Sequence, residues 1–187
     1  ATPLLLWGFW FLDTDRLVPF AATAAAACLT KEQIGLVVAA MGLWYALRPA
    51  RRRVGLAIAA AGTLVSLLAV TVVVPFFAPG GGSPFAGRYA EVGGSPGGIA
   101  RTAVTDPGAL VAATTEGRDV GYLGDLLLPL LGLPLLAPLA ALTAAPELLL
   151  NLLSDTRTQT SIHFHYTAGA IPGLMVAAVL FTPRRSR

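Results

Sequence analysis

Apolar runs, separated by short polar or proline- and glycine-rich stretches, dominate the hydrophobic pattern of this 187-residue chain. The clearest run extends from Val54 to Phe77 and contains no charged side chain. As a helix it exceeds the roughly 20 residues that cross a bilayer. The arginines at 51–53 precede it, and Pro75 and Pro79 are expected to end it. This pattern predicts a membrane-spanning helix.

Residues 17–47 are also apolar, but Lys31 and Glu32 interrupt the middle of this stretch. A single helix would place both charges near the hydrocarbon centre, which is costly. Two short helices, 17–29 and 34–47, would instead carry Lys31 and Glu32 at the tip of a hairpin. Helices of that length do not cross a full bilayer, so the hairpin predicts a thinned region or a protein-lined polar cavity.

The other helices are expected to be shorter or interrupted. Residues 2–12 are too few to cross a bilayer, and the chain begins without a Met, which indicates a fragment of a longer protein that lacks its N-terminal part. Residues 79–119, rich in Gly, Ser, Thr and Pro, predict an outer loop with one short helix near 107–115, capped by Asp106. Four prolines divide the next apolar stretch into a second hairpin. The remaining expected helical segments are 121–133, 138–153 and 168–182.

Composition narrows the class of protein. Hydrophobic residues make up 55% of the chain and charged residues 12%, and the mean hydropathy is +0.70. Soluble domains carry about 25% charged residues, which argues against a soluble enzyme and against a disordered tail. The arginine clusters flank apolar runs without interleaved aromatic residues, so nucleic acid is not the expected partner. The sequence predicts an all-α, polytopic integral membrane protein, with a single membrane domain fragment over residues 1–187.

The charges also predict sidedness. With two hairpins, one side of the bilayer receives Arg16, the four arginines within 48–53 and the three C-terminal arginines, against two anions. The other side receives five cations and eight anions. Cytoplasmic edges are enriched in Lys and Arg. We therefore expect a multi-pass protein of the cell (plasma) membrane. Its residues 48–53 and C-terminus would be cytoplasmic, and its loops 79–119 and 154–166 extracytoplasmic.

Polar side chains within the apolar segments are the first candidates for chemistry, because they are costly in lipid. Lys31 and Glu32 fit either a self-neutralising pair that caps two helix ends or a lysine that binds an anionic lipid headgroup. Glu147, followed by Asn151, fits either a satisfied buried contact or a polar cavity.

The segment His163-Phe164-His165-Tyr166 is the other candidate. In an extended segment His163 and His165 would share one face. Two histidines without a carboxylate or cysteine at ligand spacing are weak evidence for a metal, so no metal is assigned. We expect hydrogen bonding at the membrane surface, with Tyr166 at the interface, or a contact to substrate. His163 is grouped with Glu147 and Asn151 as a polar-cavity residue. The catalytic residues stay unknown, since the chain has no paired-carboxylate or nucleophile motif.

Several motifs together carry a resemblance to a known family. They are Leu29-Thr30-Lys31-Glu32 with the helix, arginine-rich turn and long span that follow, the proline-rich run 128–138, Ala145–Ser154, Gln159, His165-Tyr166 and Pro172. In this combination the chain resembles, over nearly its whole length, an uncharacterised bacterial family of predicted polytopic membrane proteins. That family is designated domain of unknown function twenty-seventy-nine.

The family is similar to the GT-C class of membrane glycosyltransferases, which use polyprenyl-phosphate sugars on the outer side of the membrane. The resemblance implies that Thr30-Lys31 faces a lipid-phosphate cavity, with Lys31 on the donor phosphate and His165 or Tyr166 at the rim. Glu32, which stands where a glycine is common, completes the expected substrate-binding set. The catalytic acid of that class would lie upstream of this fragment.

The implied activity is transfer of a sugar from a polyprenyl-phosphate donor to an extracytoplasmic acceptor. The lipid bilayer and the lipid-linked donor are the expected partners, and no other cofactor is assigned. Two alternatives come from other functional classes. Broken helices could line the path of a membrane transporter or flippase, or the chain could be a non-catalytic membrane scaffold.

Overall fold

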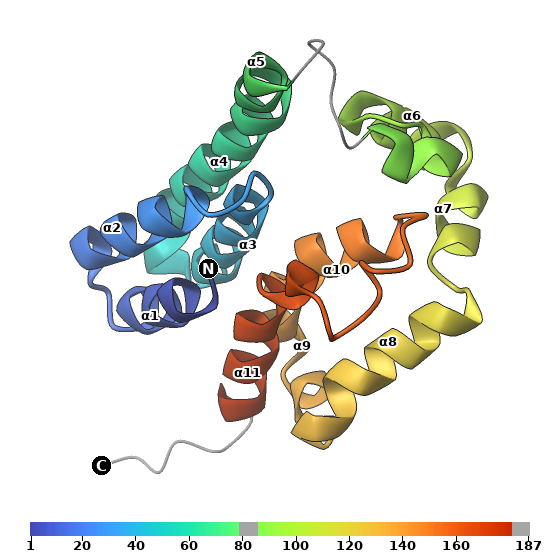
Figure 1. Cartoon of the computed structure of the whole chain (residues 1–187). Coiled ribbons are helices and arrows are strands. Elements are labelled where there is room, and N and C mark those ends of the chain that lie inside the picture. The colour runs from blue at the N-terminus through green and yellow to red at the C-terminus, as the bar shows by residue number, and fades with distance from the viewer. Residues whose placement is uncertain (79–85, 181–187) are drawn as a thin grey trace.

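The chain is all-helical in a computed structural model, which describes residues 1–78 and 86–180 (Figure 1). No strand occurs in these two ranges, which confirms the predicted all-α class. The helices of the first part are α1 (Thr2–Asp13), α2 (Leu17–Cys28), α3 (Ile34–Ala46), the 3-10 turn η1 (Pro49–Arg51) and α4 (Arg52–Leu68).

One apolar core joins α1, α2 and α3. Its side chains that are exposed by 1% or less include Leu5 and Leu12 of α1 and Ile34 and Met41 of α3. The core is possible because the turn between α1 and α2 is tight. Asp15 has a φ of 61° there, a left-handed conformation that Asp tolerates better than most residues.

Small residues let α3 and α4 approach until their backbones touch. They repeat at intervals of four and three residues, as Gly35, Ala39, Gly42 and Ala46 on α3 and as Gly55, Ala59, Gly62 and Ser66 on α4. A Cβ added at Gly42 would lie 2.6 Å from the Ala59 nitrogen, and one at Gly62 would lie 2.5 Å from the Gly35 carbonyl oxygen. Interfaces of this kind are typical of helix pairs in membranes.

The long helix ends at Phe77, where the apolar run was expected to end. After α4 it passes through a π-helical stretch, η2 (Ala69–Val73), into α5 (Val74–Phe77), so the expected end is confirmed, although Pro75 itself lies inside the helix and does not break it. A proline ring clashes with the carbonyl four residues earlier and lacks a donor. The wider π turn in front of Pro75 accommodates both effects.

This continuous helix, Pro49–Phe77, has 29 residues and is the single candidate membrane span, by length and composition, within residues 1–78 and 86–180. Only 11% of its most apolar window is buried, and Phe76 and Phe77 are both more than three-quarters exposed. The other apolar helices are shorter. An exposed apolar surface of this extent fits contact with lipid, whereas several full crossings remain a prediction.

The second part of the chain is more helical than expected. Its elements are η3 (Ala86–Val92), α6 (Pro96–Thr105), α7 (Pro107–Ala113), α8 (Gly117–Leu127), η4 (Leu128–Leu130), η5 (Leu133–Leu136), α9 (Pro138–Ala141), η6 (Leu142–Ala144), α10 (Ala145–Leu152), η7 (His165–Thr167) and α11 (Ala170–Leu180). The expected loop 79–119 is therefore helical over most of its described part, from residue 86 on. Ser95 caps α6 and Asp106 caps α7, each followed by a proline in the first turn.

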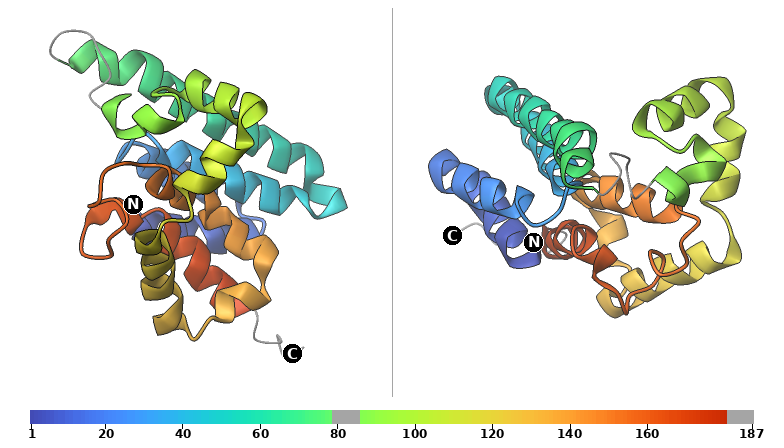
Figure 2. Two further views of the ribbon diagram at one scale, coloured as in Figure 1. Left: turned by 90° about the vertical axis from the view of Figure 1, so that its right-hand side faces the viewer. Right: turned by 45° about the horizontal axis from the view of Figure 1, so that its top comes forward.

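Around the expected second hairpin, α8 begins at Gly117 and ends at Leu127, and the chain turns at Leu131 and Gly132, both with positive φ. Residues 181–182 of the last expected segment, 168–182, lie outside the described ranges. α10 packs against α3, and α11 packs against α1 (Figure 2). This packing brings the turn between α2 and α3 to the second part of the chain.

Candidate functional site

A buried ion pair joins the turn between α2 and α3 to helix α10. Lys31 Nζ lies 3.6 Å from Glu147 Oε1, and the side-chain amide of Gln33 donates a hydrogen bond to the same oxygen at 3.2 Å. The Glu147 side chain is 1% exposed and that of Lys31 is 19% exposed. A buried carboxylate needs such partners, because leaving water costs it several kcal/mol. The pair therefore fixes the turn against the second part of the chain.

The ring of Tyr166 lies close to two cations, Lys31 and Arg88. Lys31 Nζ lies 4.7 Å from the centre of the Tyr166 ring, and the guanidinium carbon of Arg88 lies 5.8 Å from the same centre. His165 stacks on Tyr166, with ring centres 4.4 Å apart. Cations within about 6 Å of an aromatic ring are attracted by its quadrupole. Segments from η3, η7 and the turn before α3 thus converge in one cationic and aromatic cluster.

Helix α10 turns a polar face toward the interior. Glu147 and Asn151 share one face of the helix, and Ser154 follows just beyond its end; each of the three is 1% exposed or less. The Asn151 amide donates one hydrogen bond to the Tyr122 hydroxyl and one to the Tyr166 carbonyl, both at 2.9 Å. The second bond fixes the backbone of Tyr166, so Asn151 positions the ring that faces Lys31.

Gly169 leaves the space that this arrangement needs. A Cβ at this position would lie 2.9 Å from Glu147 Oε2. Oε2 finds no hydrogen-bond partner among the described residues, and neither does Lys31 Nζ. The distance of 3.6 Å between Nζ and Oε1 exceeds that of a hydrogen bond, so the ammonium group, which is itself buried, has donor capacity that no acceptor among the described residues uses.

The structure brings most of the expected site residues together. Lys31, Glu147, Asn151, His165 and Tyr166 lie in this cluster. In the described contacts Lys31 pairs with Glu147 and not with its neighbour Glu32, so the self-neutralising pair is not what forms. The Glu32 carbonyl accepts a hydrogen bond from the Ser66 hydroxyl at 2.7 Å.

The expectation of an extended segment with His163 and His165 on one face is wrong. His165 begins the 3-10 turn η7, which rotates its ring onto Tyr166. His163 is exposed, and its backbone nitrogen donates to the Ser161 hydroxyl at 3.3 Å. Within residues 1–78 and 86–180, no group of three or more His, Cys, Asp or Glu side chains is placed to hold a metal ion.

Sequence reasoning missed Arg88 and Gln33 as members of the site. Arg88 lies in a stretch that the sequence predicts to be a loop. Its carbonyl accepts a hydrogen bond from the Asp155 nitrogen at 2.9 Å. This bond connects η3 to the segment before η7. No spacing rule connects residues so far apart. Gln33 could have been suspected, since it is a polar residue that directly follows the Lys-Glu pair.

Two groups in the second part of the chain, Tyr89 and Asp119, have a shifted pKa. Burial raises the pKa of the Tyr89 phenol in η3, while a hydrogen bond with Gln159 and the nearby Arg88 charge act in the opposite direction. Burial likewise raises the pKa of the Asp119 carboxyl, against the effect of Arg118 beside it. Both shifts show that polar side chains of the second part are enclosed by protein.

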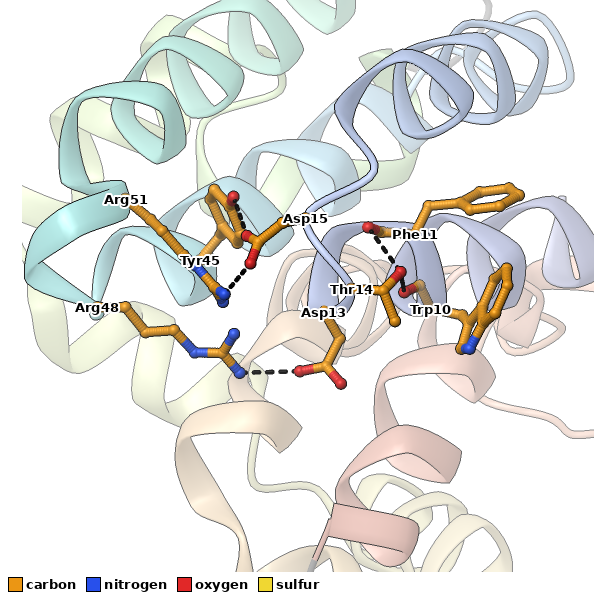
Figure 3. Close-up of polar contacts among 8 residues, drawn as sticks. All are labelled: Trp10, Phe11, Asp13, Thr14, Asp15, Tyr45, Arg48 and Arg51. Carbon is orange, nitrogen blue, oxygen red and sulfur yellow. Dashed lines mark hydrogen bonds and ion pairs between the residues drawn. The ribbon is translucent and has the colours of Figure 1, made fainter.

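A second polar cluster lies at the opposite end of α3 (Figure 3). Arg48 pairs with Asp13 at 2.8 Å, and Arg51 pairs with Asp15. The Tyr45 hydroxyl donates a hydrogen bond to Asp15 at 2.6 Å. These contacts, which we call the arginine clasp, hold the turn after α1 against the turn after α3.

Replacing Asp15 by asparagine is expected to loosen the arginine clasp by about 1 kcal/mol, because partly exposed ion pairs contribute about that much at most. Asparagine also tolerates the left-handed backbone at this position, so the change isolates the charge. Thermal unfolding in detergent at low and high salt measures the effect, which should shrink as salt rises. Asp125→Asn, at an exposed position of α8, is the control. An equal loss in both variants, or a salt-independent loss, would contradict this assignment.

The fold and the two polar clusters define a helical membrane protein. Its longest helix exposes apolar side chains over most of its length, and charged groups lie at the ends of the apolar helices. The chain belongs to the family described as Predicted membrane protein (DUF2079), which matches residues 1–187. A search of curated proteins found no match, and a search of solved structures found none either.

Proposed function

We propose that this chain forms the donor-phosphate site of a GT-C-like membrane glycosyltransferase. The enzyme would transfer a sugar from a polyprenyl phosphate to an extracytoplasmic acceptor. The observation that carries the proposal is the convergence of Lys31 and Arg88 on the ring of Tyr166, beside the buried carboxylate of Glu147. His165 would form the rim of the site, since it is exposed and stacks on that ring.

The two cations suit a phosphate in different ways. Lys31 offers a compact charge whose ammonium protons make no hydrogen bond within the described residues. Arg88 offers a planar guanidinium that can bind two phosphate oxygens at once. Glu147 and Gln33 hold the lysine from behind, so its charge is positioned before a ligand arrives. A site of this kind binds the phosphodiester and leaves the sugar and the lipid tail outside the cluster.

The position of the site along α3 supports the proposed sidedness. α3 has 13 residues and therefore separates Lys31 from the arginine clasp by about 20 Å. If the arginine clasp lies at the cytoplasmic edge, as the bias of arginines favours, Lys31 lies toward the outer side. The short helices α2, α3, α10 and α11 would then enter the membrane as hairpins of a multi-pass protein.

In the reaction, the bond between the anomeric carbon and the phosphate oxygen breaks, and its electron pair leaves on the polyprenyl phosphate. An acceptor hydroxyl oxygen forms the new bond to the anomeric carbon, and its proton passes to a carboxylate base. Lys31 and Arg88 would stabilise the negative charge that grows on the leaving phosphate. This is the step in which their contribution to the rate is expected.

Two variants test the site without leaving a lone buried carboxylate. Glu147→Gln keeps the lysine, and Lys31→Gln/Glu147→Gln removes it, so both leave the cluster free of a lone carboxylate. We expect the single variant to bind radiolabelled polyprenyl-phosphate glucose with only a small loss of affinity, because it keeps the charge of Lys31 and loses only a group that positions it. The double variant should lose about tenfold in affinity, the effect of one charge-assisted hydrogen bond of about 1.5 kcal/mol. Arg101→Gln, at an exposed arginine of α6, controls for the loss of one positive charge.

Lys31 also gives a direct readout, because it is the only lysine of the sequence. Polyprenyl phosphate should protect it from an amine-reactive reagent, as measured by mass spectrometry of the peptide that contains residue 31. Equal donor binding by the single and double variants, or unprotected labelling, would overturn the proposal. Transport of polyprenyl phosphate across vesicles without any sugar transfer would also overturn it, in favour of a flippase.

A further inference from the structure

Helix α1 carries an apolar groove on the side away from the arginine clasp. The groove is shallow and open to the surface, has a volume of about 460 Å³ and is lined by Pro3, Leu6, Trp7 and Trp10. They follow one another at the spacing of one helix face, over about 10 Å of helix. Trp7 is 55% exposed and Trp10 is 47% exposed. Two tryptophans exposed side by side along an apolar groove are a surface suited to a hydrocarbon chain.

A cation stands at one end of this groove. The guanidinium carbon of Arg16 lies 5.7 Å from the centre of the Trp10 ring and 5.5 Å from that of Phe11. Trp10 lines the groove, so the charge of Arg16 lies where the groove ends. Figure 3 shows Trp10 and Phe11 on the side of the turn away from Arg48 and Arg51.

The carboxylates near Arg16 are already neutralised. Asp13 pairs with Arg48 and Asp15 pairs with Arg51. Arg16 is exposed and takes part in no ion pair within the described part of the chain. Its charge is therefore available to an external anion, and the phosphate of a phospholipid is the anion that a bilayer supplies together with acyl chains.

We propose that this surface is a binding site for an anionic glycerophospholipid. The headgroup phosphate would bind Arg16, and one acyl chain would lie in the groove along Trp7 and Trp10. The tryptophans would sit at the level of the headgroups, where such side chains gather in membrane proteins. The site is separate from Lys31 and does not depend on the proposed sugar transfer.

The tryptophans provide the test, since brominated acyl chains quench the fluorescence of a tryptophan that they contact. Trp44 is the third tryptophan, so the protein with Trp44→Phe reports on Trp7 and Trp10. This protein is reconstituted in phosphatidylcholine that contains a small fraction of either brominated phosphatidylglycerol or brominated phosphatidylcholine. We expect the anionic lipid to quench at about fivefold lower concentration, because one arginine near the surface attracts it by about 1 kcal/mol.

Two further variants separate the possible outcomes. Arg16→Gln should abolish the preference for phosphatidylglycerol and leave quenching by phosphatidylcholine unchanged. Arg52→Gln, at an exposed arginine of the α4 N-terminus, should keep the preference. Equal quenching by both lipids in the starting protein would show general lipid contact only and would overturn the proposal. Loss of the preference in both arginine variants, or no quenching by either lipid, would overturn it as well.

Discussion

Replacing Gly42 by leucine is expected to lower the free energy of unfolding by about 3 kcal/mol, the upper end of the cost of overpacking. Even the first side-chain atom would lie 2.6 Å from the Ala59 nitrogen and 2.7 Å from the Gly55 carbonyl oxygen. Both are backbone atoms and cannot rotate away. The two helices must therefore separate, and the contacts along the small-residue interface are lost together.

Thermal unfolding in detergent, followed by tryptophan fluorescence, measures this change. Gly121→Leu is the matched control, because Gly121 is exposed on helix α8 and a Cβ there would meet nothing within 4 Å. It has the same change of residue type and the same gain of side-chain volume. If Gly42→Leu unfolds at the same temperature as Gly121→Leu, the backbones of α3 and α4 are not in the close contact described here.

Lys31→Ala is expected to destabilise the protein by about 3–5 kcal/mol, the cost of leaving one partner of a buried pair without its counter-charge. Glu147→Gln should cost less than half as much. The reason is the unequal freedom of the two side chains. Glu147 is 1% exposed, whereas Lys31 is 19% exposed, and its long stem allows the buried ammonium group to move toward water once the carboxylate is removed. The two single variants therefore report on the same ion pair with different penalties.

The double variant Lys31→Ala/Glu147→Gln completes the cycle. It should be more stable than Lys31→Ala alone, with a coupling energy of about 2–3 kcal/mol, because no lone carboxylate remains. Equilibrium unfolding of all four proteins in the same detergent gives the coupling energy. Additive effects of the two substitutions would show that Lys31 and Glu147 do not interact.

The hairpin tip at Lys31 was predictable because its signal is local. Two adjacent charges in an apolar stretch favour a break in the helix, because an unbroken helix would place them at the hydrocarbon centre. The observed end of α2 and start of α3 lie within two residues of the expected positions. The end of the long helix at Phe77 was predictable too, but the way the helix passes Pro75 was not. Proline usually disrupts a helix, but a π-helical stretch in front of Pro75 absorbs it, and no local pattern announces that.

The site was predictable as a set of residue types and not as a geometry. Glu147 and Asn151 share a helix face because they are four residues apart, which the sequence shows directly. That Glu147 pairs with Lys31 depends on α10 packing against α3. That Arg88 faces Tyr166 depends on a backbone contact to Asp155.

By itself, then, the sequence determined the all-α class, the membrane character and the places where charges interrupt apolar helices. These follow from composition and periodicity, which act over a few turns of helix. Only the tertiary structure decided which charge neutralises which, because Lys31 and Glu147 are 116 residues apart and meet only when α10 packs against α3. It also decided that Arg16 forms no ion pair within the described part of the chain, because Asp13 and Asp15 pair with Arg48 and Arg51 at the turn between α3 and α4.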